Sequence, residues 1–237
     1  MQVHPVVKKV YNALKEYISQ GGSLLLAVSG GADSMVLLWA LLDKQKQVGF
    51  HLYVVNVNHH IRGEESDRDS LFEHGLRGEE ALADAELVRR FCEEKGLAFT
   101  CVHVDVNAYS QGNKLSTEEA ARKLRYAALE EEVLALQADF IVTAHHSDDQ
   151  AETVLLKLLR GAGTEGLSGM QVRSGKLLRP LLHLTREHLE NYCALQNINY
   201  CYDSSNDDLH YTRNKIRREL LPYLEKNFNP AIKKAVV

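Results

Sequence analysis

The sequence predicts an α/β protein: a doubly wound parallel sheet with helices on both faces, plus a small, mostly helical C-terminal region. Strand-like and helix-like segments alternate along the chain, as they do in a parallel sheet with crossover helices. The first strand-like run, Leu24 to Val28, is apolar at every position, which is typical of a strand buried on both faces. After Arg179 no long apolar strand run occurs. With 237 residues, 45% of them hydrophobic, the chain can bury one substantial core with a small appendage.

The individual elements follow from the spacing of apolar residues. Residues 1–19 carry lysines and place Val6, Val10 and Leu14 at helical spacing, which predicts an amphipathic helix and not an export signal. Strands are predicted at 24–28, 50–57, 98–104 and 140–143. Helices are predicted between them, near 35–47, 79–95 and 116–137. Ligands bind beyond the carboxyl ends of strands in such sheets, so the loops after positions 28, 57, 104 and 143 are expected to converge on one cleft.

The C-terminal part of the chain is expected to form a separate, basic region. Arg179, Pro180 and Leu181 break the alternating pattern, so we expect a larger domain at 1–178 and a helical segment at 179–237. From His210 to Val237 there are seven basic residues and two acidic ones, in a chain whose net charge is −4. A concentrated basic end suits contact with a polyanion such as RNA, although basic runs are often only solvated.

A phosphate-binding loop is predicted where the first strand ends. It comprises Ser29, Gly30, Gly31, Ala32, Asp33 and Ser34. Two glycines permit a tight turn and close approach of a ligand, while the amides at the following helix start attract an anion. The lysine of a Walker A loop is absent, and Asp33 would repel a polyphosphate unless a divalent cation lay between them. We therefore expect a nucleotide with Mg²⁺, against the plainer interpretation of an ordinary strand–turn–helix with an Asp-Ser cap.

A second chemically rich segment, TAHHSDDQAET, spans residues 143–153. Ser147 and Gln150 have the spacing of a capping box at a helix start. Asp149 and Glu152 are three residues apart, so they share one face of the first helical turn and should point into the cleft. Two such carboxylates could hold an ammonium group or a metal, whereas favourable interaction with the helix dipole would also explain acids here.

Several histidines near these segments keep open roles. They are His59 and His60 at the end of the second strand, and His145 and His146 before the acid pair. The second pair are candidates for phosphate contact or proton transfer, and neither pair has zinc-site spacing with other His or Cys residues.

A cationic helix face is predicted in the segment STEEAARKLRY. Ser116 and Glu119 form a capping box there, and Arg122 and Arg125 lie three residues apart with Tyr126 beside them. A glycine triplet at 161, 163 and 166 satisfies GxGxxG, but it follows a helix and not a strand. We therefore interpret residues 161–169 as a flexible linker and not as a dinucleotide site.

The four cysteines form no CxxC pair and are too sparse for a disulfide scaffold. This usage predicts a cytoplasmic protein, and the sequence gives no reason to expect a membrane partner. It also counts against enzymes that transfer sulfur through paired cysteines.

The SGGADS segment resembles the signature of the PP-loop ATP pyrophosphatases, which have an adenine nucleotide alpha hydrolase-like fold. Further motifs follow it in order: RGEE, LSTEEAARKLRY, the segment TAHHSDDQAETVLLKLLRGAGTEGLSG, RPLL and DSSNDDLHYTRNKIRRELLP. Together they resemble the tRNA(Ile)-lysidine synthases from about residue 24 to residue 222. RGEE occurs twice, at 62–65 and 77–80, so one copy resembles an insertion. Members of this family usually continue well beyond the present length.

The resemblance implies a two-step ligation. ATP, with Mg²⁺, would adenylate the C2 oxygen of the wobble cytidine in tRNA(Ile) bearing the CAU anticodon, and the amine of free L-lysine would then attack C2 and expel AMP. It implies that Ser29 to Ser34 hold the pyrophosphate and that the C-terminal segment contacts the tRNA. Homodimer formation is weakly implied. Catalytic roles are implied for Asp33, Arg125, Asp149, Glu152 and Arg217.

Within the implied site, Asp149 and Glu152 match the positions that hold the lysine, and Arg125 and Arg217 match arginines near the phosphates or the reacting cytidine. Two alternatives stay open at this point. One is a PP-loop ligase that amidates a small metabolite, and the other is a non-catalytic ATP-binding module.

Overall fold

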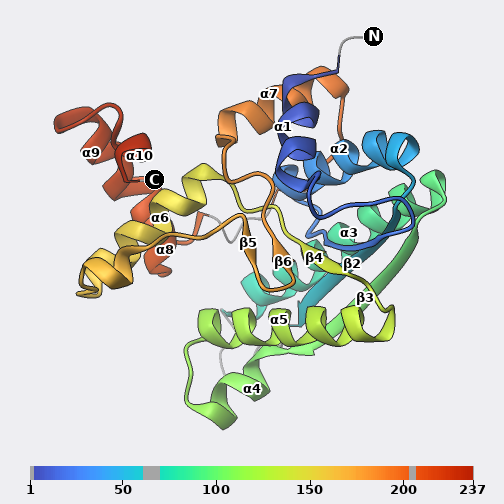
Figure 1. The fold of residues 1–237 in the computed structure, drawn as a ribbon. Coiled ribbons are helices and arrows are strands. Elements are labelled where there is room, and N and C mark those ends of the chain that lie inside the picture. Colours follow the sequence, from blue (N-terminus) through green and yellow to red (C-terminus); the bar gives the residue numbers. More distant parts are fainter. Residues whose placement is uncertain (1–2, 61–69, 203–206, 237) are drawn as a thin grey trace.

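The computed structural model describes residues 3–60, 70–202 and 207–236, and for residues 60, 70–81, 164 and 165 it describes only the backbone (Figure 1). The first RGEE copy lies outside the described residues, and the second falls where only the backbone is described. Which copy occupies the usual family position therefore stays open.

A six-stranded sheet forms the centre of the molecule, in the order β3-β2-β1-β4-β6-β5. All neighbouring pairs are parallel except β5 with β6. The strands are β1 (Ser23–Ala27), β2 (His51–His60), β3 (Ala98–Asp105), β4 (Phe140–Val142), β5 (Arg173–Ser174) and β6 (Leu177–Leu178). The first four confirm the predicted strands. The last two were not predicted, because two residues are too few to show a strand period.

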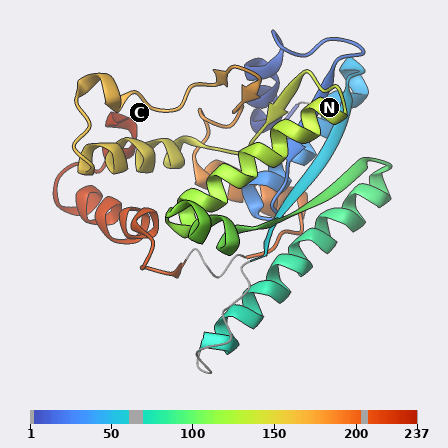
Figure 2. The same cartoon turned by 90° about the horizontal axis from the view of Figure 1, so that it is seen from below.

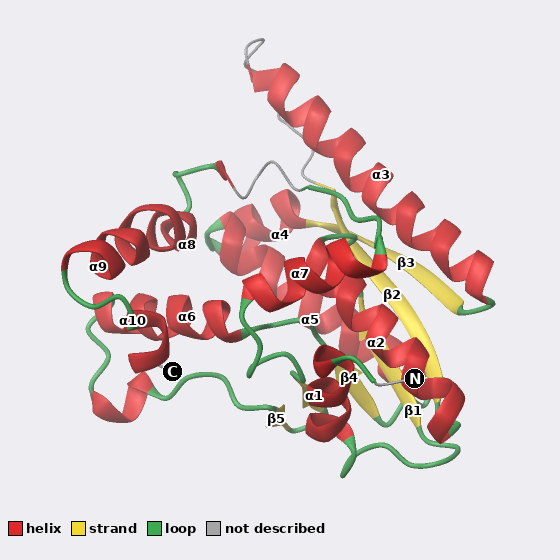
Figure 3. Ribbon diagram, turned by 90° about the horizontal axis from the view of Figure 1, so that it is seen from above, coloured by secondary structure: helices red, strands yellow, loops and turns green. Residues whose placement is uncertain are grey.

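One face of the sheet is covered by four helices, as Figure 3 shows. They are α1 (Pro5–Leu14), α2 (Ala32–Val48), α3 (Ser70–Lys95) and α7 (Arg186–Gln196). Leu24, Leu26 and Val28 face these helices, and Leu189 and Cys193 of α7 belong to the same core. Thus α7, although it follows residue 179, packs as part of the main core, and the division of the chain near 179 stays a prediction.

The opposite face is covered by α5 (Thr117–Ala135), which runs across it in Figure 2. Leu25 and Val55 of the sheet pack there against Leu129 and Val133. Leu25 thus faces the opposite way to Leu24 and Leu26, so β1 is buried on both faces as the continuous apolar run predicted. A short helix, α4 (Val106–Asn113), joins β3 to α5 and was not predicted.

Helix α6 (Ser147–Leu159) leaves the carboxyl edge of the sheet and packs against the C-terminal helices. Ala151 and Leu155 of α6 are buried against Ile216 and Leu221. The C-terminal elements are α8 (Thr212–Lys215), a single π-helical turn η3 (Ile216–Leu220), α9 (Leu221–Asn227) and α10 (Ile232–Ala235). In the part of the chain that the structure describes, no helix is both long and apolar enough to cross a membrane.

Two of the predicted local features differ from the structure. Helix α3 begins at Ser70, well before the expected position 79, although its C-terminus at Lys95 was predicted. The predicted capping box of Ser147 and Gln150 is wrong, because His146 is the N-cap of α6 and its backbone N–H donates to the Asp149 carboxylate at 3.0 Å. A histidine is an unusual N-cap, so the serine one residue later was the more typical choice from sequence.

Candidate active site

The loop after β1 has the form expected of an anion-binding turn. Gly30 has φ +94°, a left-handed conformation that glycine adopts without strain, and its carbonyl accepts the backbone N–H of Cys201 at 2.9 Å. Gly31 is the N-cap of α2, which runs for 17 residues. Ser34 donates its hydroxyl to the Gly31 carbonyl at 2.9 Å, and its Oγ lies 3.3 Å from that of Ser29. The loop therefore presents the start of a long helix to the carboxyl edge of the sheet.

We expect the Gly30→Ala variant to weaken this loop. A Cβ at Gly30 would lie 3.1 Å from the Cβ of Asp84 in α3, and the positive φ costs a non-glycine residue about 1–2 kcal/mol. Thermal denaturation should show a loss of stability of that order, and calorimetry should show weaker ATP binding. Gly112→Ala is the control, since no atom lies within 4 Å of its added Cβ. Equal stability and ATP affinity in the two variants would contradict the close packing at Gly30.

Behind this loop, His146 lies among three carboxylates. Its Nε2 is 3.4 Å from Asp33 and 3.5 Å from Asp149, and its Nδ1 is 3.6 Å from Asp148. The imidazole is almost completely buried. Burial alone would lower the pKa of His146, but the three carboxylates outweigh it and raise the pKa to about 10. His146 is therefore a buried imidazolium that joins the phosphate-binding loop to the first turn of α6.

Asp148, which lies beside His146, connects the start of α6 to α7 and α10. Its Oδ2 accepts the backbone N–H of Arg186, at the start of α7, at 2.9 Å. Its Oδ1 lies 3.2 Å from the Nζ of Lys233 in α10. Burial opposes ionisation of Asp148, but His146, Arg186 and Lys233 together hold its pKa well below the usual range.

The predicted acid pair meets two arginines of the C-terminal region. Glu152 is 1% exposed and accepts the Nε of Arg213 at 2.7 Å and the Nε of Arg217 at 2.5 Å. Asp149 lies 3.4 Å from an Nη2 of each arginine. The shared partners confirm that the two carboxylates lie on one face of α6. We refer to Asp33, Asp148, Asp149 and Glu152 as the acid cluster.

Arg213 was not identified as a site residue from the sequence. It stands four residues before Arg217 in TRNKIRR, the spacing that puts two helical side chains on one face. That spacing was the available signal, but it was obscured by the many other basic residues nearby. In the structure both arginines form ion pairs with the buried carboxylate of Glu152. Without them this carboxylate would be an unpaired charge in the protein interior.

The predicted cationic face of α5 lies at the same edge of the sheet. Ser116 caps α5 by accepting the backbone N–H of Glu119 at 3.2 Å, which confirms the predicted helix start. The Arg125 guanidinium lies 3.3 Å from the Nε2 of His59, at the end of β2. Burial and Arg125 together lower the pKa of His59 to about 4. Arg122 instead stacks over the ring of Tyr126 at 5.1 Å.

The pKa of His145 is affected both by a carboxylate of the acid cluster and by the arginines around it. Burial lowers its pKa to about 4, the charge of Asp149 opposes this effect, and Arg179, Arg213 and Arg125 reinforce it. Its Nδ1 lies 2.9 Å from the hydroxyl of Thr143. At neutral pH His145 is therefore uncharged, in contrast to its neighbour His146.

The segment predicted as a linker, 161–169, and Met170 directly after it are hydrogen-bonded to α6. Gln150 donates its amide to the Met170 carbonyl at 2.9 Å and accepts the Met170 backbone N–H at 2.5 Å. Lys157 donates to the carbonyl of Ser168 at 2.7 Å. A short 3-10 helix, η1 (Thr164–Leu167), lies within this segment.

The surroundings of Asp33 are compatible with a bound cation. Its Oδ1 is buried and has no hydrogen-bond partner among the described residues. The described residues contain no group of three or more His, Cys, Asp or Glu side chains that could hold a metal by themselves. A magnesium ion here would thus take one carboxylate from the protein and its other ligands from phosphate and water, as Mg²⁺ often does.

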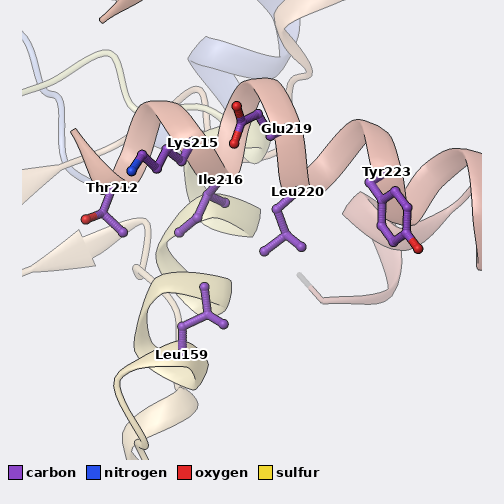
Figure 4. Close-up of a pocket in the computed structure, with 7 residues that line it drawn as sticks. All are labelled: Leu159, Thr212, Lys215, Ile216, Glu219, Leu220 and Tyr223. Carbon is purple, nitrogen blue, oxygen red and sulfur yellow. The ribbon is translucent and has the colours of Figure 1, made fainter. Parts of the chain in front are cut away.

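A pocket of about 460 Å³ lies on another face of the C-terminal helices (Figure 4). Ile216 and Leu220 point toward Leu159 of α6, while Lys215 and Glu219 are the charged residues among its lining. None of the predicted site residues lines it. Its apolar character makes it unsuitable for phosphate chemistry, so the acid cluster and the loop after β1 remain the candidate site.

Two solved structures share the fold. The U34-tRNA thiolase NcsA from Methanococcus maripaludis, solved with its 4Fe-4S cluster, superposes with a TM-score of 0.75 at 19% identity. The match covers 98% of this chain and 76% of that one. The NH3-dependent NAD synthetase from Campylobacter jejuni superposes with a TM-score of 0.53 at 15% identity, over 98% of this chain and 90% of its own. Both likenesses show the fold alone.

Sequence comparison is more specific. A PP-loop domain model matches residues 2–72 and 69–224. The tRNA(Ile)-lysidine synthases of Clostridium acetobutylicum and Clostridium perfringens are 37% and 39% identical over 96% and 95% of this chain, which spans 47% and 45% of their lengths. That of Petrotoga mobilis is 37% identical over 96% of this chain and 68% of its own length. The chain therefore belongs to the PP-loop domain family and, within it, to the family of the tRNA(Ile)-lysidine synthases.

Proposed function

We propose that this chain ligates free L-lysine to C2 of the wobble cytidine of tRNA(Ile) with the CAU anticodon, using ATP to adenylate the cytidine. The observation that carries the proposal is the link through His146, which lies 3.4 Å from Asp33 of the phosphate-binding loop and 3.5 Å from Asp149 of the acid pair. The proposed nucleotide site and the proposed cation-binding site would thus be adjacent. The similarity to tRNA(Ile)-lysidine synthases supports tRNA(Ile) as the substrate.

In the adenylation step, the loop from Ser29 to Ser34 would hold the pyrophosphate part of ATP against the N-terminus of α2. The cations Arg125 and Arg217 would stabilise charge that develops as the bond to pyrophosphate breaks. Asp33 would provide the protein ligand to Mg²⁺, whose chemistry is to neutralise and orient phosphate oxygens.

In the ligation step, we assign the lysine ammonium to Asp149. Glu152 is already held by both arginines at 2.5–2.7 Å, whereas Asp149 meets them only at 3.4 Å. Although burial opposes it, His146 and Arg213 hold the pKa of Asp149 below its usual range, so it stays ionised and can receive an ammonium. Glu152 then acts chiefly by fixing the arginines. The amine must lose a proton before it attacks C2, since only the neutral amine is nucleophilic.

The target base must be turned out of the anticodon loop for its C2 to be reached, which single-stranded loops permit at low cost. The basic C-terminal segment would contact the tRNA backbone. Homodimer formation and a cytoplasmic location remain part of the proposal, implied by the family resemblance and by cysteine usage.

Labelled lysine, ATP and Mg²⁺ should test the reaction directly. We expect incorporation into an unmodified tRNA(Ile) transcript bearing CAU, and none into a transcript whose wobble cytidine is replaced by uridine. Incorporation into both transcripts would contradict the assigned target. No incorporation into either would contradict the proposed ligation by this chain.

The same assay separates the two alternatives. A small-metabolite ligase would release pyrophosphate without tRNA, in response to a metabolite. A non-catalytic module would bind ATP and release no pyrophosphate under any condition.

A further inference from the structure

Arg179 is a buried arginine whose charge the proposed reaction does not yet use. It directly follows β6, and the Thr143 backbone N–H donates to the carbonyl of the preceding Leu178 at 3.0 Å. The residue therefore lies at the carboxyl edge of the sheet, beside the segment that leads to His145 and His146. Arg179 as a whole residue is only 7% exposed.

The guanidinium of Arg179 has few partners for a buried cation. One nitrogen, Nη1, donates to the Gln171 carbonyl at 3.0 Å. Its Nε is buried and has no hydrogen-bond partner within the described residues, and no carboxylate described by the structure forms an ion pair with it. Buried charges are normally paired, so a guanidinium with these contacts can receive an anion.

The groups around His145 carry charges of both signs. Arg179 and Arg125 are both close enough to His145 to shift its pKa, and both lower it. Asp149 also acts on His145, in the opposite direction, so the buried arginine and the ammonium-binding carboxylate are both within electrostatic range of the same imidazole. An elongated ligand with an anion at one end and a cation at the other matches this distribution of charge.

We infer that Arg179 binds the α-carboxylate of the amino acid substrate whose side-chain ammonium is held at Asp149. The inference rests on the proposed function and adds to it the group that recognises the other end of lysine. A guanidinium pairs with a carboxylate through two parallel hydrogen bonds, and Nε with one Nη forms such a pair of donors. Recognition of the carboxylate would distinguish a free amino acid from a simple alkyl diamine.

The test is equilibrium binding of lysine and of cadaverine, the diamine that lacks the carboxylate, to the purified chain by calorimetry. The wild-type protein should bind lysine more tightly. Arg179→Gln should weaken lysine binding by about 10- to 100-fold, the range for a hydrogen bond to a charged group, and leave cadaverine binding unchanged. Arg179→Lys, which keeps the charge without the fork, should recover part of the loss.

Arg173→Gln serves as the matched control. Arg173 stands on β5 of the same hairpin, is exposed and stacks on Tyr17, so its loss should not change the preference for lysine. The inference would be overturned if Arg179→Gln bound lysine as tightly as the wild type, or if it lost affinity equally for lysine and cadaverine. Circular dichroism at the assay temperature would identify an unfolded variant. If Arg179→Gln proves unfolded, a reduced preference for lysine over cadaverine in folded Arg179→Lys would support the inference, and an unchanged preference would overturn it.

The binding assay and the incorporation assay can fail independently of each other. Lysine binding without incorporation into tRNA would contradict the proposed function and leave the carboxylate site supported. Incorporation with equal affinity for lysine and cadaverine would contradict only the role of Arg179.

Discussion

The Arg217→Gln variant should release pyrophosphate from ATP, in the presence of tRNA(Ile), at least about 100-fold more slowly than the wild-type chain. Removal of one preorganised charge from a site where negative charge develops typically costs this factor or more. The loss should appear in kcat, because the proposed contact strengthens in the transition state. The fold should survive, since Glu152 keeps its bond to Arg213 at 2.7 Å.

Arg218→Gln is the control for this variant. Arg218 is the next residue along the chain, but it is exposed and contacts Tyr202 and Asp207 instead of the acid cluster. Its rate of pyrophosphate release should stay within about twofold of wild type, the range of a mere surface change. Unchanged pyrophosphate release in Arg217→Gln would exclude the proposed role of Arg217 in adenylation.

The His146→Gln variant should lose about 3 kcal/mol of stability, a cost typical of removing one partner from a buried ion pair. The substitution leaves Asp33, Asp148 and Asp149 facing one another without the buried cation that they share. For a chain of this size, the melting temperature should fall by roughly 6–12 °C at pH 6. His183→Gln, at an exposed histidine, should melt within about 1–2 °C of wild type.

The loss of stability in His146→Gln should become smaller as the pH rises. The folded protein raises the pKa of His146 from 6.5 to about 10, so its contribution to stability is complete below pH 6.5 and is lost as the pH rises through 10. The difference in melting temperature between wild type and His146→Gln should therefore shrink from pH 6.5 toward pH 10. A difference that stays constant over this range would show that His146 is not charged in the folded protein.

The sequence predicted the framework of the site because that framework depends on short-range patterns. A continuous apolar run identified β1 as a buried strand, and the two glycines after it predicted the tight turn in which Gly30 has a positive φ. The spacing of Asp149 and Glu152 was enough to place both on one helical face, since helical geometry fixes which side chains are neighbours. Predictions of this kind need only the local chain.

The parts that were missed depend on contacts between distant residues. Glu152 and Arg213 are 61 positions apart, so no local sequence pattern predicts that they form a buried ion pair. The imidazole of His146 likewise lies beside Asp33, in the first turn of α2, a contact between residues far apart in the sequence. Likewise β6 pairs with the edge of β4 and β5 pairs with β6, and each is too short to be predicted from its own residues.

The pairing of the acid cluster with residues near the C-terminus has a consequence for the order of events during translation. A ribosome makes the four carboxylates first, and Arg213 follows Glu152 by 61 positions, with Arg217 and Lys233 later still. At ordinary elongation rates this gap lasts roughly 3–12 seconds. During that interval the nascent chain carries Glu152 without either of the arginines that later neutralise it. The complete charge arrangement around the acid cluster thus arises only after the last helices have been synthesised.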